Sequence, residues 1–350
     1  MDKKVAVILI NYHDYANRFL SDCRDSLRSQ TYNNFQVYII DNDSSEETLS
    51  YLKTNYEEAI ILPREDGNYS AANNLGFRTA LEDGADYLVA LNMDTEVEAN
   101  FLNELVKALE LNQQAGIAQA KILLHQKGKK ENKLNSIGNI IHFLGFGFTD
   151  GYGQNDFQIA GYPEIKGYAS GCAFIITKEA FNLVGGLNEE FYMYHDDVEL
   201  SLKVKLAGYK IILAPQARVW HKYEFERSVR MFYYMERNRY LTLVIFASKR
   251  YLALIALPLL FMDIAMFVFA VLNGRLKELL KVYAYFLKSQ NLDKILAERK
   301  RFKKIQNLKF SEVAHNFKAR IEFQEIANPI LKYIANPLMA VYWFLIKKII

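Results

Sequence analysis

Cysteine is scarce in this 350-residue chain, which contains only Cys23 and Cys172. Two cysteines this far apart provide neither a disulfide framework nor the close spacing of a zinc site, and they suit a reducing compartment. We also expect no signal peptide, because the apolar run from Val5 to Ile10 is short and leads directly into polar residues. We therefore expect a chain that works in a reducing environment.

Net charge is small but unevenly distributed. The formal charge is +3, yet from Arg275 onward 16 Lys and Arg residues face 6 acids, which leaves +10 there and −7 in the remainder. The basic cluster at 294–309 matches no recognised nucleic-acid-binding motif. We therefore expect no nucleic-acid partner, and we interpret the cluster as a solvated or membrane-facing helix.

Three short apolar runs predict buried parallel strands. They are Val5–His13, the run from Phe35 to Asp41, and Ala85–Asp94. Helical patterns at Tyr15–Ser29 and Ala71–Leu81 lie between them, and this alternation is typical of a doubly wound α/β sheet. Ligands of such sheets bind beyond the carboxyl ends of the strands, where Asn11, Asp41 and Asp94 fall.

The segment from Phe191 to Gly208 brings two adjacent aspartates, Asp196 and Asp197, to the start of a predicted helix. A strand would also fit the alternation from 198 to 206, but the length and the glycine stop favour a helix. Two neighbouring carboxylates repel each other, so burying both is costly unless a site uses them to take a proton or to hold a metal. Alternatively, they cap the helix.

Seven strings carry a resemblance to a known family. They are INYH, DNDSSEET, NYSAANNLG, LNMDTEV, ASGCAFIITKEAF, GGLNEEFYMYHDDVELSLKVKLAGYKI and the WH at 220–221. Over roughly residues 4–245 the chain resembles the family 2 glycosyltransferases, in particular their bacterial rhamnosyltransferase-type branch. The resemblance implies an α/β fold of the GT-A type, with a Rossmann-like, mostly parallel central sheet flanked by helices.

The resemblance also implies a domain organisation. A catalytic domain at 1–240 would have a donor half at about 1–100 and an acceptor half at about 101–240. Residues 241–350 would form a helical, membrane-associating extension.

Donor-binding residues follow from the same resemblance. Asp41 would accept a hydrogen bond from the pyrimidine base in a pocket completed by Asn11 and Tyr12, although an Asx-turn would also explain Asp41. Asn73 and Asn74 would lie near the base and ribose, or cap their helix.

Two further segments belong to the same donor site. Ser170 and Gly171 would let the backbone approach the transferred sugar. At Asn68, where the family usually has glycine, we expect a left-handed turn that asparagine tolerates.

A divalent metal is implied by LNMD at 91–94, which stands where the family has its DXD motif. Asn92 stands in place of the first acid and Met93 at the variable middle position, and both would bind the donor. Asp94 is left as the carboxylate ligand of Mg²⁺ or Mn²⁺. His221 matches a histidine that binds the metal in related enzymes, although lone histidines are more often ordinary hydrogen-bonding residues. We expect Glu96, two residues further on, to face water; the alternative is that it assists the metal.

Asp197 matches the catalytic base of the family, and Asp196 would raise its basicity. The base would take a proton from the acceptor hydroxyl while configuration at the sugar inverts. Which of the two aspartates removes the proton stays open.

The acceptor side is assigned to the stretch from Lys127 to Gly167, which is rich in glycine and aromatic residues. Long loops of this kind often form lids or binding surfaces. We expect His142, Asp156 and Tyr194 to contact the acceptor.

Membrane attachment is suggested by the apolar run from Tyr251 to Asn273, which Pro258 and Asp263 interrupt, and by basic residues near both ends. A second apolar stretch, 337–350, includes two lysines. We expect in-plane or hairpin insertion at the cytoplasmic face of the cell membrane. The alternative is a soluble helical domain that packs against the catalytic core or a second subunit of a homo-oligomer.

The function predicted from the sequence is a non-processive glycosyltransferase. It would use a dTDP- or UDP-sugar, with dTDP-rhamnose as the resemblance-based donor, and a lipid-linked or polysaccharide acceptor. A processive synthase would carry QxxRW well downstream of the base, whereas QARVW at 216–220 has another spacing and comes too early. A nucleotidyltransferase would need a phosphate loop after the first strand, and INYHDYAN offers none. An inactive sugar-nucleotide-binding module is the remaining alternative.

Overall fold

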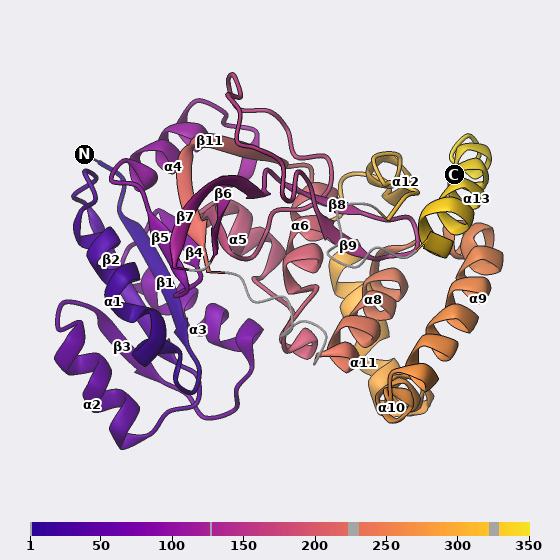
Figure 1. Ribbon diagram of the computed structural model, residues 1–350, viewed down its shortest axis with the longest axis horizontal. Helices are drawn as coiled ribbons and strands as arrows, with labels where there is room; N and C mark the ends of the chain where they lie inside the picture. Colours follow the sequence, from indigo (N-terminus) through magenta and orange to yellow (C-terminus); the bar gives the residue numbers. More distant parts are fainter. Residues whose placement is uncertain (1, 127, 223–230, 322–328) are drawn as a thin grey trace.

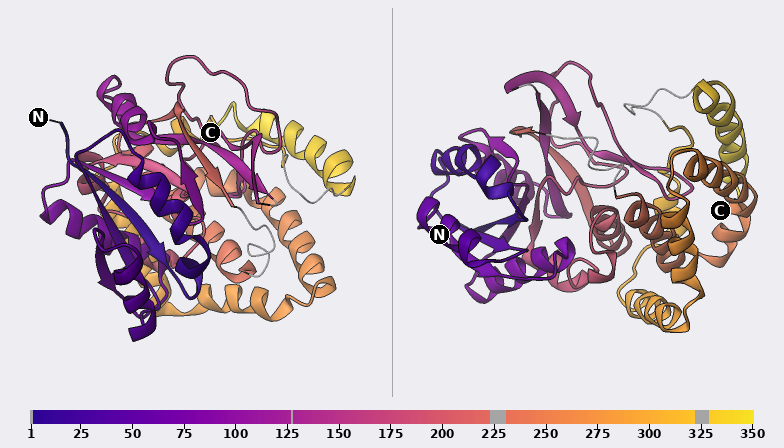
Figure 2. Two further views of the ribbon diagram at one scale, coloured as in Figure 1. Left: turned by 60° about the vertical axis from the view of Figure 1, so that its left-hand side comes forward. Right: turned by 60° about the horizontal axis from the view of Figure 1, so that its bottom comes forward.

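A mixed β-sheet between helices forms the N-terminal two thirds of the protein (Figure 1). The computed structural model describes every residue except 1, 127, 223–230 and 322–328. Within these described residues nine strands form one sheet in the order β3-β2-β1-β4-β10-β6-β11-β5, with β7 beside β6. The C-terminal helices gather on the side of the molecule opposite the N-terminus (Figures 1 and 2).

The first half of the sheet is parallel. Its strands are β1 (Val5–Asn11), β2 (Phe35–Asp41), β3 (Ile60–Pro63) and β4 (Tyr87–Leu91). The helices between them are α1 (Tyr15–Arg28), α2 (Glu46–Asn55) and α3 (Tyr69–Glu82). Every residue of β1 is buried, which explains why its sequence is a continuous apolar run. The three predicted strands and the two predicted helices are therefore confirmed.

The second half of the sheet is mixed, because β10 runs antiparallel to both β4 and β6. Its strands are β5 (Thr95–Val97), β6 (Ala115–Gln126), β7 (Lys129–Ser136), β10 (Ala173–Thr177) and β11 (Lys210–His221). The helices are α4 (Phe101–Glu110), α5 (Lys178–Val184), the 3₁₀ turn η1 (Glu189–Phe191) and α6 (Asp196–Leu206). The mostly parallel sheet that we expected is thus found in two parts, β1 to β4 and the β6–β11 pair. The antiparallel strand β10 lies between these two parts.

The glycine-rich stretch 127–167 is more ordered than the expected long loop. Residue 127 lies outside the described residues, and β7 then pairs with β6 in an antiparallel arrangement. Further along, β8 (Asn139–Ile141) pairs with β9 (Gly147–Thr149) in a small separate sheet. These strands are short and bounded by glycines with positive φ, such as Gly138 and Gly145, so their alternation is too brief to recognise in the sequence.

The predicted glycine stop of α6 is confirmed, since Gly208 has a φ of +102°. The prediction for Asn68 was wrong. Asn68 has an extended backbone with φ −75°, and it caps α3 by accepting a hydrogen bond from the N–H of Ala71 at 3.0 Å. The left-handed residue is Gly67, at φ +67°, where a Cβ atom would lie 2.7 Å from the hydroxyl of Tyr192.

The C-terminal region is helical. Its elements are α8 (Phe232–Phe246), α9 (Lys249–Leu272), α10 (Leu276–Leu287), α11 (Ser289–Lys303), α12 (Phe310–Ala314), the π-helical turn η2 (Leu331–Ala335) and α13 (Asn336–Ile346). By length and composition alone, α9 could cross a membrane. Asp263, in the middle of α9, lies 3.4 Å from Nη2 of Arg239 and accepts a hydrogen bond from Tyr240, so α8 neutralises the charge.

Candidate active site

A cavity of about 320 Å³ opens where the predicted site residues meet at the carboxyl ends of β1 and β4. The predicted residues that line it are Tyr12, Asn92, Met93, Asp94, Ser170, Gly171, Tyr194, Asp196, Asp197 and His221. They come from segments spread over more than 200 positions of the sequence. The fold therefore brings the expected metal ligands and the expected catalytic pair into one cavity.

Asp94 and His221 lie side by side in this cavity. Nε2 of His221 is 3.4 Å from Oδ1 of Asp94, and both side chains are buried. The hydroxyl of Tyr15 donates to Oδ2 of Asp94 at 2.9 Å, and Nδ1 of His221 lies 3.4 Å from Oδ1 of Asn135. Burial alone would lower the pKa of His221, but Cys172 and Asp94 beside it raise this pKa well above its usual value.

This pair fits a partial metal site. In the part of the chain that the structure describes, no three His, Cys, Asp or Glu side chains gather around one point. Mg²⁺ at nucleotide sites commonly takes one or two carboxylates and leaves its other positions to phosphate oxygens and water, and Mn²⁺ also accepts imidazole. The oxygen of Asp94 and the nitrogen of His221 suit that chemistry, with Tyr15 and Asn135 fixing their orientation.

Asp196 and Asp197 are the first two residues of α6, as predicted. Asp197 accepts two hydrogen bonds from the backbone: Oδ2 from the N–H of Gly171 at 3.1 Å, and Oδ1 from the N–H of Val198 at 2.8 Å. Burial raises the pKa of both carboxyl groups, and the charge of Asp197 raises that of Asp196 further. Both aspartates are therefore better proton acceptors, when ionised, than an exposed aspartate.

The backbone before α6 is strained. Tyr192, Tyr194 and His195 have φ values of +65°, +63° and +59°, which residues other than glycine rarely adopt. Strained positions of this kind cluster at functional sites, where the surrounding structure must hold them in place. Tyr194 lines the cavity, as expected for an acceptor contact.

Asn11 and Asp41 are neighbours at the ends of β1 and β2 but do not line the cavity. The amide of Asn11 donates to Oδ1 of Asp41 at 2.7 Å, and the hydroxyl of Thr48 donates to Oδ2 at 2.6 Å. Both residues are completely buried. Their role at the base of the donor stays a prediction.

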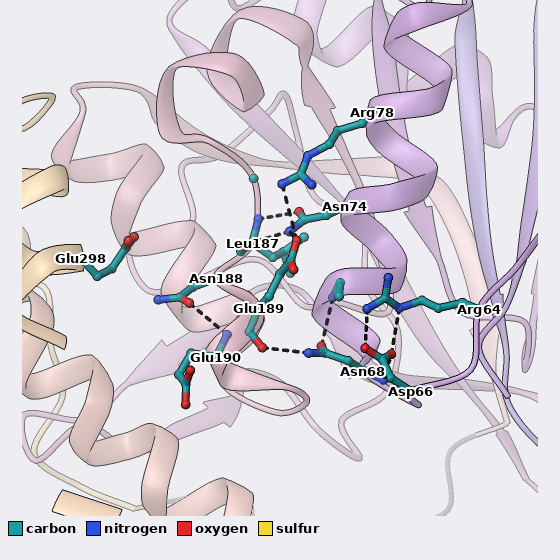
Figure 3. A network of polar contacts seen from close by, with 12 residues as sticks. Arg64, Asp66, Asn68, Asn74, Arg78, Leu187, Asn188, Glu189, Glu190 and Glu298 are labelled. Carbon is teal, nitrogen blue, oxygen red and sulfur yellow. Dashed lines mark hydrogen bonds and ion pairs between the residues drawn. The ribbon is translucent and has the colours of Figure 1, made fainter. Parts of the chain in front are cut away.

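Asn73 and Asn74 lie within the second turn of α3, and their side chains bind protein atoms. Asn73 donates to the carbonyl of Tyr69 in its own helix. Asn74 donates to the carbonyl of Leu187 and to the carboxylate of Glu189, and it accepts from the N–H of Leu187, each at 2.9 Å (Figure 3). Asn74 thus fastens the loop that leads to Asp196, and its expected donor contact stays a prediction.

His142 and Asp156 have structural roles where we expected acceptor contacts. His142 is completely buried, with Nε2 3.0 Å from the carbonyl of Ala319, and burial lowers its pKa to about 3. Asp156 forms ion pairs with Lys121 at 2.8 Å and Arg218 at 3.0 Å. Neither lines the cavity, and their expected contact with the acceptor stays a prediction.

Sequence reasoning missed Tyr15, Tyr69 and Cys172, which also line the cavity. Tyr15 and Tyr69 are the first residues of α1 and α3. The hydroxyl of Tyr69 donates to Oδ1 of Asn92 at 3.0 Å. A tyrosine that opens a helix directly after the carboxyl edge of the sheet is the signal that could have identified both.

Known proteins resemble the chain in sequence. The family model described as "Glycosyl transferase family 2" matches residues 6–183. An uncharacterized protein of Sinorhizobium fredii, y4gI, is 29% identical over 231 residues, which cover 61% of this chain and 24% of that protein. The dTDP-rhamnosyl transferase RfbF of Shigella flexneri is 23% identical over 63% of this chain and 70% of its own length. The N-acetylglucosaminyl-diphospho-decaprenol L-rhamnosyltransferase of Mycobacterium tuberculosis is 32% identical over 21% of this chain and 24% of that protein.

Two solved structures have a similar fold. GalNAc-T7 with UDP, GalNAc and Mn²⁺ superposes with a TM-score of 0.58 at 16% identity, covering 71% of this chain and 48% of that one. Staphylococcus aureus TarS 1-349 superposes with a TM-score of 0.50 at 13% identity, covering 99% of this chain and 90% of that one. The first sequence relative is matched over only about a quarter of its length. The structural likeness confirms the expected GT-A fold, and the family match, which spans half the chain, shows that this protein belongs to glycosyl transferase family 2.

Proposed function

We propose that this protein transfers one sugar from a dTDP- or UDP-sugar to a hydroxyl group of a lipid-linked glycan, in the synthesis of bacterial surface polysaccharide. The observation that carries the proposal is the single cavity lined both by Asp94 and His221 and by Asp196 and Asp197. A metal-binding pair opposite a pair of proton acceptors suits transfer from a nucleotide diphosphate. The names of the Shigella and Mycobacterium relatives support rhamnose as the sugar, and the latter supports a lipid-linked acceptor.

Asp94 and His221 would hold Mg²⁺ or Mn²⁺, which when bound supplies positive charge to the diphosphate. Asn11 and Asp41 would bind the base, with Tyr12 at the cavity side. Ser170 and Gly171 would lie along the transferred sugar, since both line the cavity next to Asp197.

Asp197 would act as the base. Its carboxylate takes the proton of the acceptor hydroxyl as that oxygen bonds to the anomeric carbon, and the bond from this carbon to the diphosphate breaks on the opposite face. Configuration therefore inverts. The N–H of Gly171 fixes the carboxylate of Asp197, and burial raises the pKa of both aspartates. Such help is worth roughly 10²–10⁴-fold in rate.

Attachment to the cytoplasmic face of the membrane is part of the proposal. Helix α9 presents exposed apolar side chains, among them Leu257, Leu260, Phe261, Ile264, Phe267 and Val268. Asp263 and its partner Arg239 put an ion pair at the middle of α9, so an in-plane position that keeps this pair out of the hydrocarbon core is favoured over a span.

The test is transfer by the purified full chain. A panel of dTDP- and UDP-sugars with Mn²⁺ is first screened by thermal stabilisation, and the best donor is then assayed with a synthetic lipid-linked acceptor. We expect one donor to stabilise the protein and the product to have the inverted anomeric configuration by NMR. Retained configuration, or near-normal transfer by a folded Asp197→Asn variant, would contradict the mechanism.

A further inference from the structure

Asn238, on helix α8, contacts the strained loop that precedes the catalytic pair. Its amide nitrogen donates to the carbonyls of Phe191 at 2.8 Å, Met193 at 2.9 Å and Tyr194 at 2.7 Å. Asn238 is completely buried, and its Oδ1 accepts from Nε of Arg237 at 3.0 Å. Because this bond engages the oxygen, the two amide hydrogens face the loop, where three carbonyls share them.

Arg237 adds a second contact to the same loop. Its Nη2 donates to the carbonyls of Glu190 at 2.7 Å and Phe191 at 3.0 Å. The guanidinium lies 5.2 Å from the ring centroids of both Tyr234 and Tyr285, which holds it in place through cation–π contacts. Together, the two side chains donate hydrogen bonds to the carbonyls of four loop residues, which are Glu190, Phe191, Met193 and Tyr194.

The opposite side of the loop is held by α3. Asn74 binds Leu187 and Glu189, and the amide of Asn68 donates to the carbonyl of Glu189 at 2.9 Å (Figure 3). The residues with positive φ are Tyr192, Tyr194 and His195, directly before Asp196. The N–H of Ser70 in α3 donates to the carbonyl of Tyr192 at 3.1 Å, and Asn238 of α8 donates to the carbonyls of Met193 and Tyr194. A left-handed backbone at three non-glycine residues persists only where surrounding bonds enforce it.

We propose that Asn238 is a positioning residue for Asp196 and Asp197, which acts by holding the loop 191–195 in the conformation that points the aspartates into the cavity. The inference rests on the proposed transferase function for its kinetic consequence. Helix α8 lies beyond residues 6–183, the part that matches the family. The helical region is thereby a component of the active site as well as a candidate membrane anchor.

The test compares two buried asparagines that each hold a backbone segment. Asn336 donates to the carbonyl of Ile321 at 3.0 Å and accepts from its N–H at 2.9 Å, so Asn336→Ala is the matched control for Asn238→Ala. For Asn238→Ala we expect kcat to fall about 100-fold with the KM for the donor nearly unchanged, because misplacing a catalytic group affects the chemical step. Hydrogen exchange should accelerate at residues 192–198 in this variant alone. Asn336→Ala should keep its kcat.

The proposal would be overturned if Asn238→Ala had the same kcat as the wild type. It would also be overturned if the activity of Asn238→Ala and Asn336→Ala fell only in proportion to the fraction of each variant that is folded. If Asn238→Ala does not fold, Arg237→Lys tests the same clamp, since it keeps the charge but loses the double contact to Glu190 and Phe191. For Arg237→Lys we expect the same split of kcat from KM, to a smaller degree, and unchanged kcat would overturn the proposal. If the wild type transfers no sugar, the proposed function fails, and the exchange measurement still decides whether the clamp exists.

Discussion

The backbone N–H of Gly171 donates to Oδ2 of Asp197 at 3.1 Å, which joins the turn before β10 to the first turn of α6. A Cβ atom on Gly171 would lie 3.5 Å from Cβ of Asp197, so the two residues are in direct contact. This bond orients one carboxylate oxygen, and the N–H of Val198 orients the other. Asp197 is consequently held still while its burial makes it a stronger base.

The rate of transfer should depend on the ionisation of Asp197. Burial raises the pKa of Asp197 to about 6, and a base works only in its ionised form. We expect kcat/KM for the acceptor to be level at higher pH and to fall about tenfold per unit below that pKa, because kcat/KM reports the ionisation of the free enzyme. The measurement is kcat/KM over roughly pH 5–9. If the rate instead falls only near the pKa of an exposed aspartate, Asp197 is not the base.

The free energy of unfolding should fall as pH rises, whereas the rate of transfer should rise. A buried carboxyl group whose pKa is raised ionises less readily in the folded state than in the unfolded state, so stability is lost as pH rises from the unfolded pKa through the folded one. Asp196→Asn removes this penalty. We expect the variant to be more stable than the wild type by about 1–3 kcal/mol near pH 8, with a smaller difference near pH 5.

The control for this stability measurement is Asp293→Asn, which replaces an exposed aspartate of α11 and should leave the unfolding free energy unchanged at either pH. If the free energy of unfolding of Asp196→Asn is lower than that of the wild type near pH 8, the charge of Asp196 does not destabilise the folded protein. Denaturant unfolding followed by fluorescence suffices. The same variant should transfer sugar more slowly, since function and stability oppose each other at this pair.

Much of the site was predictable because its strands and its catalytic helix are local features. The buried runs of β1, β2 and β4, and the glycine stop of α6, depend on residues a few positions apart. The strands end in polar residues at one edge of the sheet, and α6 begins with Asp196 and Asp197. Asp94 and Asp197 therefore line the same cavity.

Other roles depend on contacts that no local pattern contains. Asn74 binds Leu187, which is 113 positions away, and His142 binds Ala319, which is 177 positions away. From the sequence alone a polar residue in a glycine-rich or helical segment looks available for a ligand. In the fold, His142 is surrounded by the C-terminal region, and Asn74 binds the loop before α6.

Removal of divalent metal should weaken donor binding through Asp94. We expect a chelator to abolish the thermal stabilisation by the donor and Mn²⁺ to restore it. Asp94→Asn should lower kcat/KM for the donor by at least about 100-fold, because a bound metal would contribute several kcal/mol to charge stabilisation. Glu96→Gln is the matched control. Glu96 was expected to face water, but it forms partly buried ion pairs with Lys130 at 2.9 Å and Lys222 at 3.1 Å, and it does not line the cavity.

Membrane binding should depend on the exposed apolar face of α9. Phe261 is 64% exposed and Ile264 is 53% exposed. Burying one such side chain in lipid makes the free energy of membrane binding more favourable by about 1.5–3 kcal/mol. We expect the full chain to float with anionic vesicles and the Phe261→Glu, Ile264→Glu double variant to remain in solution. Leu111→Glu, at a residue 66% exposed beside α4, should float like the wild type. Complete release of the wild type by salt alone would show that charge, without insertion of α9, holds the protein at the surface.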